Sequence, residues 1–287
     1  MKLIRYIAKN STGASIGILD GNTISEIPGS SGNMETIPLL DKNGLSQLQN
    51  ASISHHSLAD VRLLSPVDGS KKLLMLAANY IPTDDKLNKD LSIETPEFFS
   101  KPSTALIADG EIIPDNSLVV NQVEEIELGV IIGKPGKNIK REEAFNHIFG
   151  YTIVNDVSGR DLDFSAERQN PDRKGWFDWL NGKWLDGYCC VGPWIIPAAD
   201  LPDPTNLRLT TKVNGEIRVD SNTNRMIHSI ESQIEYISNL CTLFPGDLIS
   251  TGVALAGKDD DEIYLNPGDV IEGTLEGVGT LTNTTGK

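Results

Sequence analysis

The chain of 287 residues is 39% apolar and 23% charged, which is typical of a globular protein with one large domain, or with a large and a small one. Its formal net charge of −15 argues against nucleic acid or an anionic membrane surface as a partner. No apolar run approaches the ~20 residues of a membrane-spanning helix, and residues 1–6 lack the apolar core of a signal peptide, so we expect a cytoplasmic protein.

Residues 1–64 are predicted to form a small, β-rich N-terminal domain. Short apolar runs at 3–7, 15–19 and 23–27 are separated by turn residues, and a short helix is expected at 44–49. The Ser-Pro-Val-Asp-Gly segment that begins at Ser65 is typical of a junction. We therefore expect a second domain over residues 65–287.

Strand patterns dominate this second domain. They occur at residues 73–77, 104–108, 111–113, 125–132, 151–156, 189–196, 207–213, 248–251 and 270–275. Helical patterns are fewer and cover residues 140–148 and 224–240. Many strands, few helices and no regular strand–helix alternation predict a mixed α/β, β-rich fold that closes into rolls or barrels.

Two acids interrupt the apolar strand at 125–132. Glu125 and Glu127 are two residues apart, so both side chains project from the same face of the strand. The next strand delivers Asp156 at its end. Three clustered carboxylates repel one another unless a cation lies between them, and oxygen ligands suit Mg²⁺, Mn²⁺ or Ca²⁺. The same pattern is also typical of a strand with one solvent-exposed face, and that alternative stays open.

Other reactive groups give weaker signals. None of the four histidines lies at a strand end, and no phosphate-binding glycine motif is present. Arg160 and Lys183 follow strand ends or glycines, and Tyr80 and Lys101 follow apolar runs. Lysines and arginines beside a cation suit a substrate with carboxylate and keto oxygens. A lysine that follows a glycine in a loop is, however, usually exposed.

Cysteine chemistry is not indicated. The chain has three cysteines, and Cys189 and Cys190 are adjacent within an apolar stretch. Adjacent cysteines rarely form a disulfide with each other, and the paired spacing of a zinc ribbon is absent. We expect both to be buried, unreactive thiols.

The order and spacing of short motifs over residues 65–285 resemble the fumarylacetoacetate hydrolase family. The matching motifs are Asn79-Tyr80, Phe99-Ser100-Lys101-Pro102, Glu125-Ile126-Glu127-Leu128, residues 150–161, Gly182-Lys183, residues 191–194, residues 213–216, residues 242–247 and residues 276–283.

The resemblance implies a fold and a chemistry. The family pairs a C-terminal β-roll or barrel domain with a small N-terminal domain. It binds Mg²⁺ or Mn²⁺, and sometimes Ca²⁺, through residues that match Glu125, Glu127 and Asp156. Its catalytic lysine and arginine match Lys183 and Arg160. Its members act on small anionic 2-oxo acids, and the resemblance also suggests a homodimer.

Three departures from the family pattern affect the expected site. Hydrolytic members carry a water-activating histidine soon after Asn-Tyr, whereas Thr83 and Lys86 stand near that position here, so Thr83 and Asp84 (or Asp85) are the candidates to replace it.

The second departure is that the family's Thr-Gly-Thr-Pro element reads Thr251-Gly252-Val253-Ala254, and the third is that a family glutamine is replaced by Asp163. Tyr80, Lys101, Asp163, Thr251 and Val253 are the expected substrate-binding residues. The insert at 165–180, with Trp176 and Trp179, either contacts substrate or forms a surface lid.

The leading hypothesis is a metal-dependent hydrolase that cleaves a C–C bond in an acylpyruvate-like or 2,4-diketo acid. The alternative is a 2-oxo acid lyase, dehydratase or tautomerase, of the oxaloacetate decarboxylase or keto-deoxy sugar acid dehydratase type, which needs no activated water. A third hypothesis, a non-catalytic protein that binds 2-oxo acids, gives no reason to keep three repelling acids.

Overall fold

The structure is a computed structural model that describes residues 1–30, 32, 42–52, 54–68, 71–81, 95–163, 171–253 and 263–287. Its helices are α1 (Lys42–Asn50), α2 (Pro171–Lys183) and α3 (Ile230–Leu240), with 3-10 turns at Leu58–Asp60, Ser103–Ala105, Arg141–His147, Ala198–Asp200 and Thr223–Arg225. Its strands are β1 (Lys2–Ala8), β2 (Ser15–Asp20), β3 (Thr23–Glu26), β4 (His55–Ser57), β5 (Val61–Leu64), β6 (Leu73–Ala77), β7 (Glu97–Lys101), β8 (Leu106–Ile107), β9 (Ile112–Ile113), β10 (Val119–Val123), β11 (Ile126–Ile132), β12 (Ile148–Asn155), β13 (Ser158–Leu162), β14 (Cys189–Pro197), β15 (Arg208–Val213), β16 (Glu216–Asn222), β17 (Leu248–Ser250), β18 (Val270–Leu275) and β19 (Gly279–Thr285).

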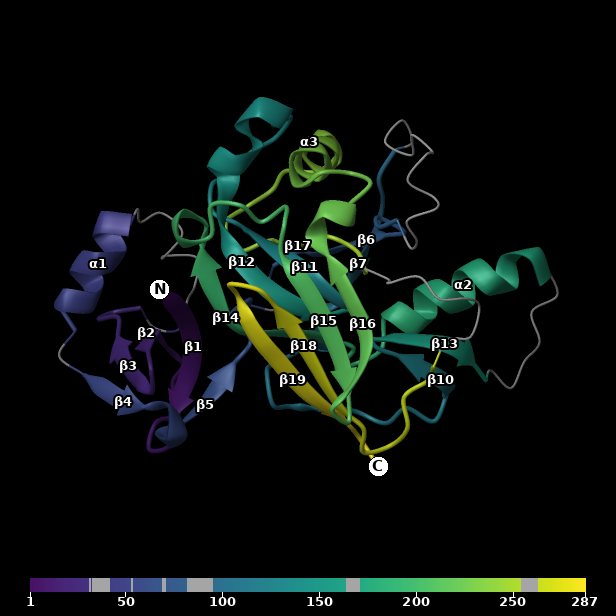
Figure 1. Cartoon of the computed structure of the whole chain (residues 1–287), viewed down its shortest axis with the longest axis horizontal. Coiled ribbons are helices and arrows are strands. Elements are labelled where there is room, and N and C mark those ends of the chain that lie inside the picture. Colours follow the sequence, from purple (N-terminus) through teal and green to yellow (C-terminus); the bar gives the residue numbers. More distant parts are fainter. Residues whose placement is uncertain are drawn as a thin grey trace.

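A 12-stranded sheet runs through the whole molecule in the order β4-β3-β2-β1-β14-β12-β11-β17-β6-β7, with β5 beside β1 and β8 beside β14. The N-terminal strands, purple in Figure 1, join it where Leu3 of β1 pairs with Ile195 of β14. Leu3 and Ile18 also share a buried apolar cluster with Leu73 and Met75 of the following segment. Sheet and core thus continue across the expected boundary at residue 64, and the two-domain division stays a prediction.

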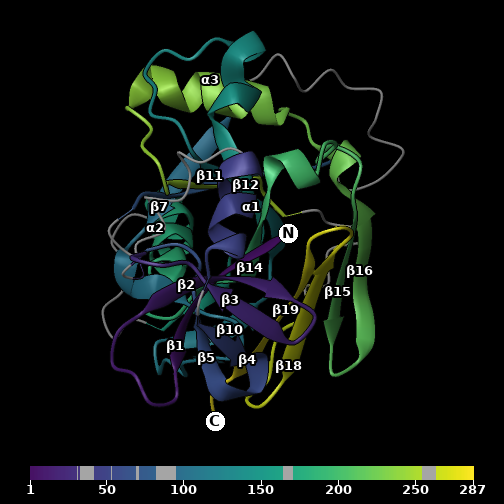
Figure 2. The ribbon, with the colours of Figure 1, turned by 90° about the vertical axis from the view of Figure 1, so that its left-hand side faces the viewer.

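A second sheet of five strands, β16-β15-β18-β19-β9, packs on the large one. Figure 2 shows β15, β16, β18 and β19 standing along one side of the molecule. Leu209 and Leu275 of this sheet share one buried cluster with Ile126 and Leu128 of β11. β15 and β16 form a hairpin whose turn residues, Asn214-Gly215, both have positive φ, as the favoured two-residue hairpin turns require.

The large sheet curves strongly at its β7 end. β7 is four strands away from β12 in the sheet order, a distance of about 19 Å if the sheet were flat. The ammonium group of Lys101, at the end of β7, nevertheless lies 2.5 Å from the carboxylate of Asp156, which follows β12. Since no lysine side chain spans 19 Å, the sheet must roll back on itself.

The predicted β-rich mixed fold is confirmed. Within the described segments the strand order is open and does not close into a hydrogen-bonded barrel. Of the predicted helices, the one at 140–148 is a 3-10 turn, and the one at 224–240 begins only at Ile230, because the Ser229 side chain caps it there. No helix in the described ranges is long and apolar enough to cross a membrane.

Candidate metal centre and active site

Two neighbouring strands bring three carboxylates together. Glu125 immediately precedes β11, Glu127 lies within it, and Asp156 immediately follows β12. β11 and β12 pair antiparallel, with Ile126 opposite Asn155, and the Asp156 amide donates to the Glu125 carbonyl at 2.8 Å. As a result, one oxygen from each of the three acids lies within 4.8 Å of the others.

The cluster is buried. Glu125, Glu127 and Asp156 are 7%, 0% and 1% exposed, and every residue of β11 is buried. The alternative that these acids mark a solvent-exposed face of a sheet is therefore wrong. Ionised carboxylates removed from water are strongly destabilising unless cations or hydrogen-bond donors compensate them.

Three side-chain cations surround two of the acids. Lys183 Nζ lies 2.7 Å from Glu125 Oε2 and 2.8 Å from Asp156 Oδ2. Lys101 Nζ reaches the other oxygen of Asp156, and Arg160 Nη2 lies 2.9 Å from Glu125 Oε1. Lys183 itself is only 2% exposed. The three positive groups thus formally balance the three acids, although none of these ion pairs includes Glu127.

Glu127 is held by neutral donors instead. Its Oε2 accepts hydrogen bonds from Ser250 Oγ at 2.6 Å and from the Gly252 amide at 2.8 Å. Its Oε1 is buried with no hydrogen-bond partner among the described residues. Burial, then the charges of Asp156 and Glu125, raise the pKa of Glu127 well above its usual range.

For Asp156 and Lys183, which form ion pairs, the pKa shifts favour the charged forms. Burial disfavours the charge of Asp156, but Lys101 and Lys183 outweigh it and lower the pKa of this carboxyl. Burial likewise disfavours the Lys183 ammonium, yet Asp156 and Glu125 outweigh that effect and raise the pKa of Lys183. Both groups are therefore charged at neutral pH.

The donor set fits a hard divalent cation. All three acidic ligands offer oxygen, which Mg²⁺, Mn²⁺ and Ca²⁺ prefer. In the described part of the chain, Glu127 Oε1 has no hydrogen-bond partner, and Asp156 Oδ1 accepts no hydrogen bond of regular geometry beside its ion pair with Lys101. A cation bound among these oxygens would satisfy both atoms and compensate Glu127.

Helix α2 explains how Lys183 comes to be buried. Lys183 ends this helix instead of lying in an exposed loop, so the expectation from its glycine context alone was wrong. A Cβ on Gly182 would overlap with the carbonyl oxygen of Gly159 in β13. The absent side chain at Gly182 therefore lets α2 pack directly on β13 and places the next residue in the cluster.

Two hydroxyl groups, those of Tyr80 and Thr251, lie beside the Glu127 end of the cluster. Tyr80 Oη lies 3.2 Å from Thr251 Oγ1, and Asn79 Nδ2 donates to the Thr251 carbonyl at 2.7 Å. Two left-handed backbone positions shape this corner: Ala78, with φ of 50°, and Gly252, with φ of 95°. Burial raises the pKa of the Tyr80 hydroxyl, so it stays a neutral hydrogen-bond donor.

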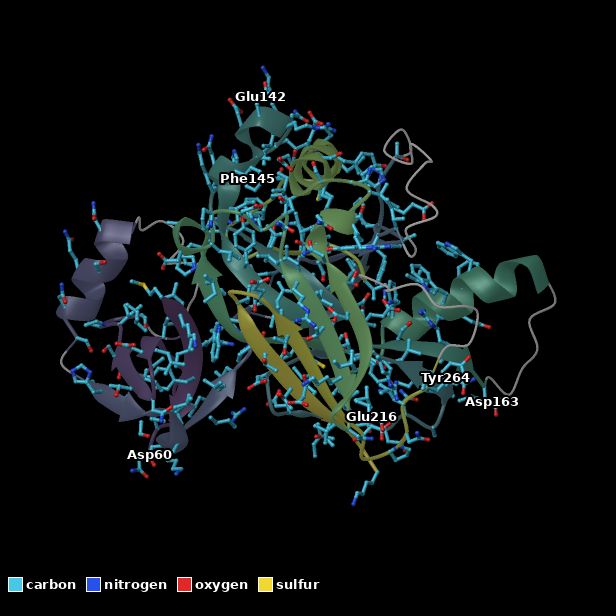
Figure 3. All side chains as sticks on the ribbon, in the orientation of Figure 1. Asp60, Glu142, Phe145, Asp163, Glu216 and Tyr264 are labelled. Carbon is cyan, nitrogen blue, oxygen red and sulfur yellow. The ribbon has the colours of Figure 1, made fainter. Side chains whose placement is uncertain are left out.

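The remaining predicted residues are placed differently. Val253 follows Gly252 and is half-buried, whereas Asp163 is exposed at the end of β13, on the outer edge of the molecule (Figure 3). The structure does not bring Asp163 to the carboxylates, and its predicted role stays a prediction. Thr83 and Asp84, with Asp85 and Lys86, lie outside the described residues.

One residue at this site, Ser250, was not singled out from the sequence, whereas Phe99 was named only within a family motif and Trp179 only within the insert at 165–180. Ser250, which binds Glu127, had no signal beyond its place at the end of an apolar run. The Phe99 ring lies 5.4 Å from Lys183 Nζ, and the Trp179 ring meets Phe99 edge-on at 5.0 Å. Phe99 is two residues before Lys101 in β7, so both side chains project from the same face of the strand. This spacing is the sequence pattern that could have placed Phe99 beside the expected site residue Lys101.

Comparison with known proteins gives a consistent set of relatives. The family model described as fumarylacetoacetate (FAA) hydrolase C-terminal matches residues 75–285 of the chain. The solved structure of fumarylacetoacetate hydrolase from the psychrophilic Exiguobacterium antarcticum is 26% identical, with a TM-score of 0.84 over 100% of this chain and 99% of that one.

Two further solved structures are similar over comparable lengths. 5-Carboxymethyl-2-hydroxymuconate delta-isomerase from Mycobacterium smegmatis is 31% identical, with a TM-score of 0.77 over 100% of this chain and 99% of that one. Maleylpyruvate hydrolase from Sphingobium sp. SYK-6, in complex with manganese(II) and pyruvate, is 26% identical, with a TM-score of 0.75 over 100% of both chains.

Proposed function

The chain belongs to the fumarylacetoacetate hydrolase family, and from this premise we propose that it is a divalent-metal-dependent enzyme that acts on 2-oxo acids. The reaction we propose is hydrolytic cleavage of a C–C bond in an acylpyruvate-like or other 2,4-diketo acid. The observation that carries the proposal is the buried Glu125, Glu127 and Asp156 cluster with Lys183 inside it. The manganese and pyruvate in the similar maleylpyruvate hydrolase support it.

The bound cation would be held by Glu125, Glu127 and Asp156. It supplies Lewis-acid polarisation of the substrate's 2-oxo group. Mn²⁺ and Mg²⁺ suit three carboxylates that keep further positions for substrate oxygens and water. This assignment requires Glu127 to be ionised in the loaded protein, because a protonated carboxyl is a poor ligand.

The chain's own residues have separate tasks in this proposal. The Lys183 ammonium, already within hydrogen-bond distance of two cluster acids, donates to the oxygen on which enolate charge develops. Lys101 holds Asp156 ionised, and Arg160 orients Glu125. The Thr251 and Tyr80 hydroxyls bind the substrate carboxylate in place of the family's second threonine.

The proposed step conserves atoms as follows. Water adds to the C4 carbonyl of the 2,4-diketo acid, and the C3–C4 bond breaks. Its electron pair passes into an enolate that gains a proton at C3, which leaves pyruvate and a carboxylic acid. The low-dielectric setting of Lys183 strengthens its stabilisation of that enolate.

One observation favours a second function, isomerisation or decarboxylation of a 2-oxo acid, which shares the enolate but needs no activated water. The described contacts of the three carboxylates include no histidine ring that could activate water. His55 and His56 lie on or beside β4 in the N-terminal strands, and His147 bonds the Lys134 carbonyl at 2.9 Å. Only His228 has its backbone beside the site, where its amide donates to Asn79 Oδ1 at 2.8 Å. The chain is also similar to an isomerase.

Product analysis separates these functions. Mn²⁺-loaded protein should consume 2,4-dioxopentanoate with loss of enol absorbance and yield one pyruvate and one acetate per substrate. Protein dialysed against a chelator should be inactive. Loss of oxaloacetate with release of CO₂, and no cleavage of the diketo acid, would replace hydrolysis by the second function. Turnover of no 2-oxo acid would contradict both.

A further inference from the structure

One face of α2 carries aromatic side chains outward from the cluster. Trp176, Trp179 and Lys183 are spaced by three and then four residues, so they follow one face of this helix. Lys183 enters the carboxylate cluster, and Trp179 lies about one turn, ~6 Å, before it along the axis. Trp176 lies one further turn away and is 59% exposed.

Strand β7 contributes a matching aromatic ring. Phe99 and Lys101 project from the same face of β7, so the ring is carried beside the lysine that pairs with Asp156. The Phe99 centroid is 5.4 Å from Lys183 Nζ and 5.0 Å from the Trp179 ring. Both rings are half-buried. α2 and β7 thus form a continuous aromatic surface that starts at Lys183.

The two ends of the cluster therefore differ in chemistry. The Glu127 end offers the hydroxyls of Tyr80 and Thr251, whereas the Lys183 end offers the rings of Phe99 and Trp179. When the polar head of a 2-oxo acid lies at the cluster, the hydroxyl end is the better binding partner for its charged carboxylate. The rest of the substrate then extends past the rings at the aromatic end.

A substrate whose tail ends in a second carboxylate is poorly matched to this aromatic surface. Lys101, Lys183 and Arg160, the cations that the described structure places at the cluster, are each paired with an acid. The protein also carries a net charge of −15. Aromatic faces bind apolar and aromatic groups through buried area and edge or stacking contacts.

We propose that Phe99 and Trp179, continued outward by Trp176, are the specificity-determining residues of the site and select 2-oxo acids with an apolar or aromatic tail over those that end in a second carboxylate. The inference rests on the proposed function, because it takes the 2-oxo acid head to lie at the carboxylate cluster. Trp179 acts on the affinity for the tail, so its effect appears in the ratio of affinities between 2-oxo acids that share a head and differ in the tail.

Three probes with the same head and different tails test this selectivity. Pyruvate has no tail, 2-oxo-4-phenylbutanoate has an aromatic one, and 2-oxoglutarate has one that ends in a carboxylate. None has a 4-oxo group, so the proposed C–C hydrolysis does not consume them during calorimetric titration of the Mn²⁺-loaded protein. We expect 2-oxo-4-phenylbutanoate to bind about tenfold more tightly than pyruvate, and 2-oxoglutarate to bind no more tightly than pyruvate.

Variants assign the effect to the rings. Trp179→Ala should reduce the phenyl advantage, the ratio of the dissociation constants of pyruvate and 2-oxo-4-phenylbutanoate, to about twofold. Trp179→Leu, which keeps an apolar side chain in the helix, is the second variant should alanine disturb the fold. Phe145→Ala is the matched control, since Phe145 is an exposed ring on the Arg141–His147 turn, away from α2 (Figure 3), and should keep the wild-type ratio.

The outcomes separate the two proposals. Equal affinity for all three probes, or tighter binding of 2-oxoglutarate, would overturn the aromatic selectivity while metal-dependent pyruvate binding still supports the 2-oxo acid site. A phenyl advantage that survives in both Trp179 variants would also overturn it. Absence of metal-dependent binding of any probe would instead overturn the proposed function, and the selectivity with it.

Discussion

Glu127 is the residue that distinguishes a metal centre from a network of ion pairs. Glu125 and Asp156 are each compensated by lysine or arginine, whereas among the described residues Glu127 receives only a hydroxyl and an amide. A fully buried carboxyl in that position favours its neutral form in the absence of a cation. Burial thus favours a proton on the Glu127 carboxyl of the metal-free protein, and a bound cation would compete with that proton.

This proton makes the stability of the metal-free protein depend on pH. The pKa of Glu127 is raised from its ordinary value of 4.5, so above pH 4.5 the folded state binds this proton more tightly than the unfolded state does. Its contribution to stability is then lost as pH rises through the raised pKa, by at most about 1.4 kcal/mol per pH unit. Glu127→Gln should flatten this slope in urea unfolding of chelator-treated protein from pH 5 to 8.

A control for the pH experiment is Glu142→Gln, because Glu142 is exposed on the Arg141–His147 turn (Figure 3). That variant should keep the wild-type slope. The lowered pKa of Asp156 acts in the opposite direction and at lower pH, since its stabilisation is lost as pH falls from 3.8 downward. An unchanged slope in Glu127→Gln would contradict the assigned protonation of Glu127.

Gly252 has two roles that substitution can separate. Its φ of 95° strains any side chain, and an added Cβ would lie 2.9 Å from the Asn79 Cβ. Its amide also donates to Glu127. Gly252→Ala should lower the free energy of unfolding by about 1–3 kcal/mol and weaken Mn²⁺ binding at least several-fold, measured by urea unfolding and calorimetry.

Gly215 provides the matched control for Gly252. It has a φ of 83° and no described atom within 4 Å of its Cβ position, so Gly215→Ala carries the backbone strain without the clash. It should lose comparable stability and bind Mn²⁺ as the wild type does. Equal metal affinity in both variants would show that Gly252 does not shape the cluster.

At the scale of elements, the packing of α2 on β13 positions Lys183. Gly182→Ala would push the helix away from the Gly159 carbonyl and should displace Lys183, lowering both thermal stability and turnover. Gly175→Ala on the same helix meets no described atom within 4 Å and should stabilise the protein by up to about 1 kcal/mol through helix propensity. Equal melting temperatures and equal turnover in the two variants would contradict this role of Gly182 in positioning Lys183.

The same elements show where prediction from sequence succeeds and fails. The Glu125–Glu127 alternation and the strand that ends at Asp156 are local patterns, so all three carboxylate positions were predictable. α2 was missed because Gly175, Gly182 and several aromatic residues give its sequence low helix propensity. The contact of Lys101 with Asp156 depends on curvature accumulated over four strand pairs, which no local pattern records.

At the scale of the whole molecule, the positions of two adjacent cysteines show that β14 lies between two buried apolar clusters. Cys189 belongs to one buried cluster and Cys190 to another, because consecutive side chains of β14 point to opposite faces. Both are fully buried, as predicted, and burial raises the pKa of the Cys189 thiol to about 12. Cys241 is only partly buried.

Thiol titration tests this packing. At pH 8, a disulfide reagent should label about one thiol per chain rapidly in the native protein, because the other two are shielded and neutral, and all three in denaturant. Rapid labelling of three thiols in the native protein would contradict the arrangement of β14 between the two clusters.

The central claim, that the buried carboxylates form a metal site, is tested most directly by calorimetric titration of chelator-treated protein with Mn²⁺. We predict one tight site per chain, with affinity lowered at least about 100-fold in Glu127→Gln, because that variant keeps the shape of the side chain and removes a charged ligand. Glu124→Gln is the matched control, since the neighbouring Glu124 pairs with Arg218 at 3.1 Å, and it should bind Mn²⁺ as the wild type does. Wild-type affinity in Glu127→Gln, or no binding in the wild type, would contradict the claim.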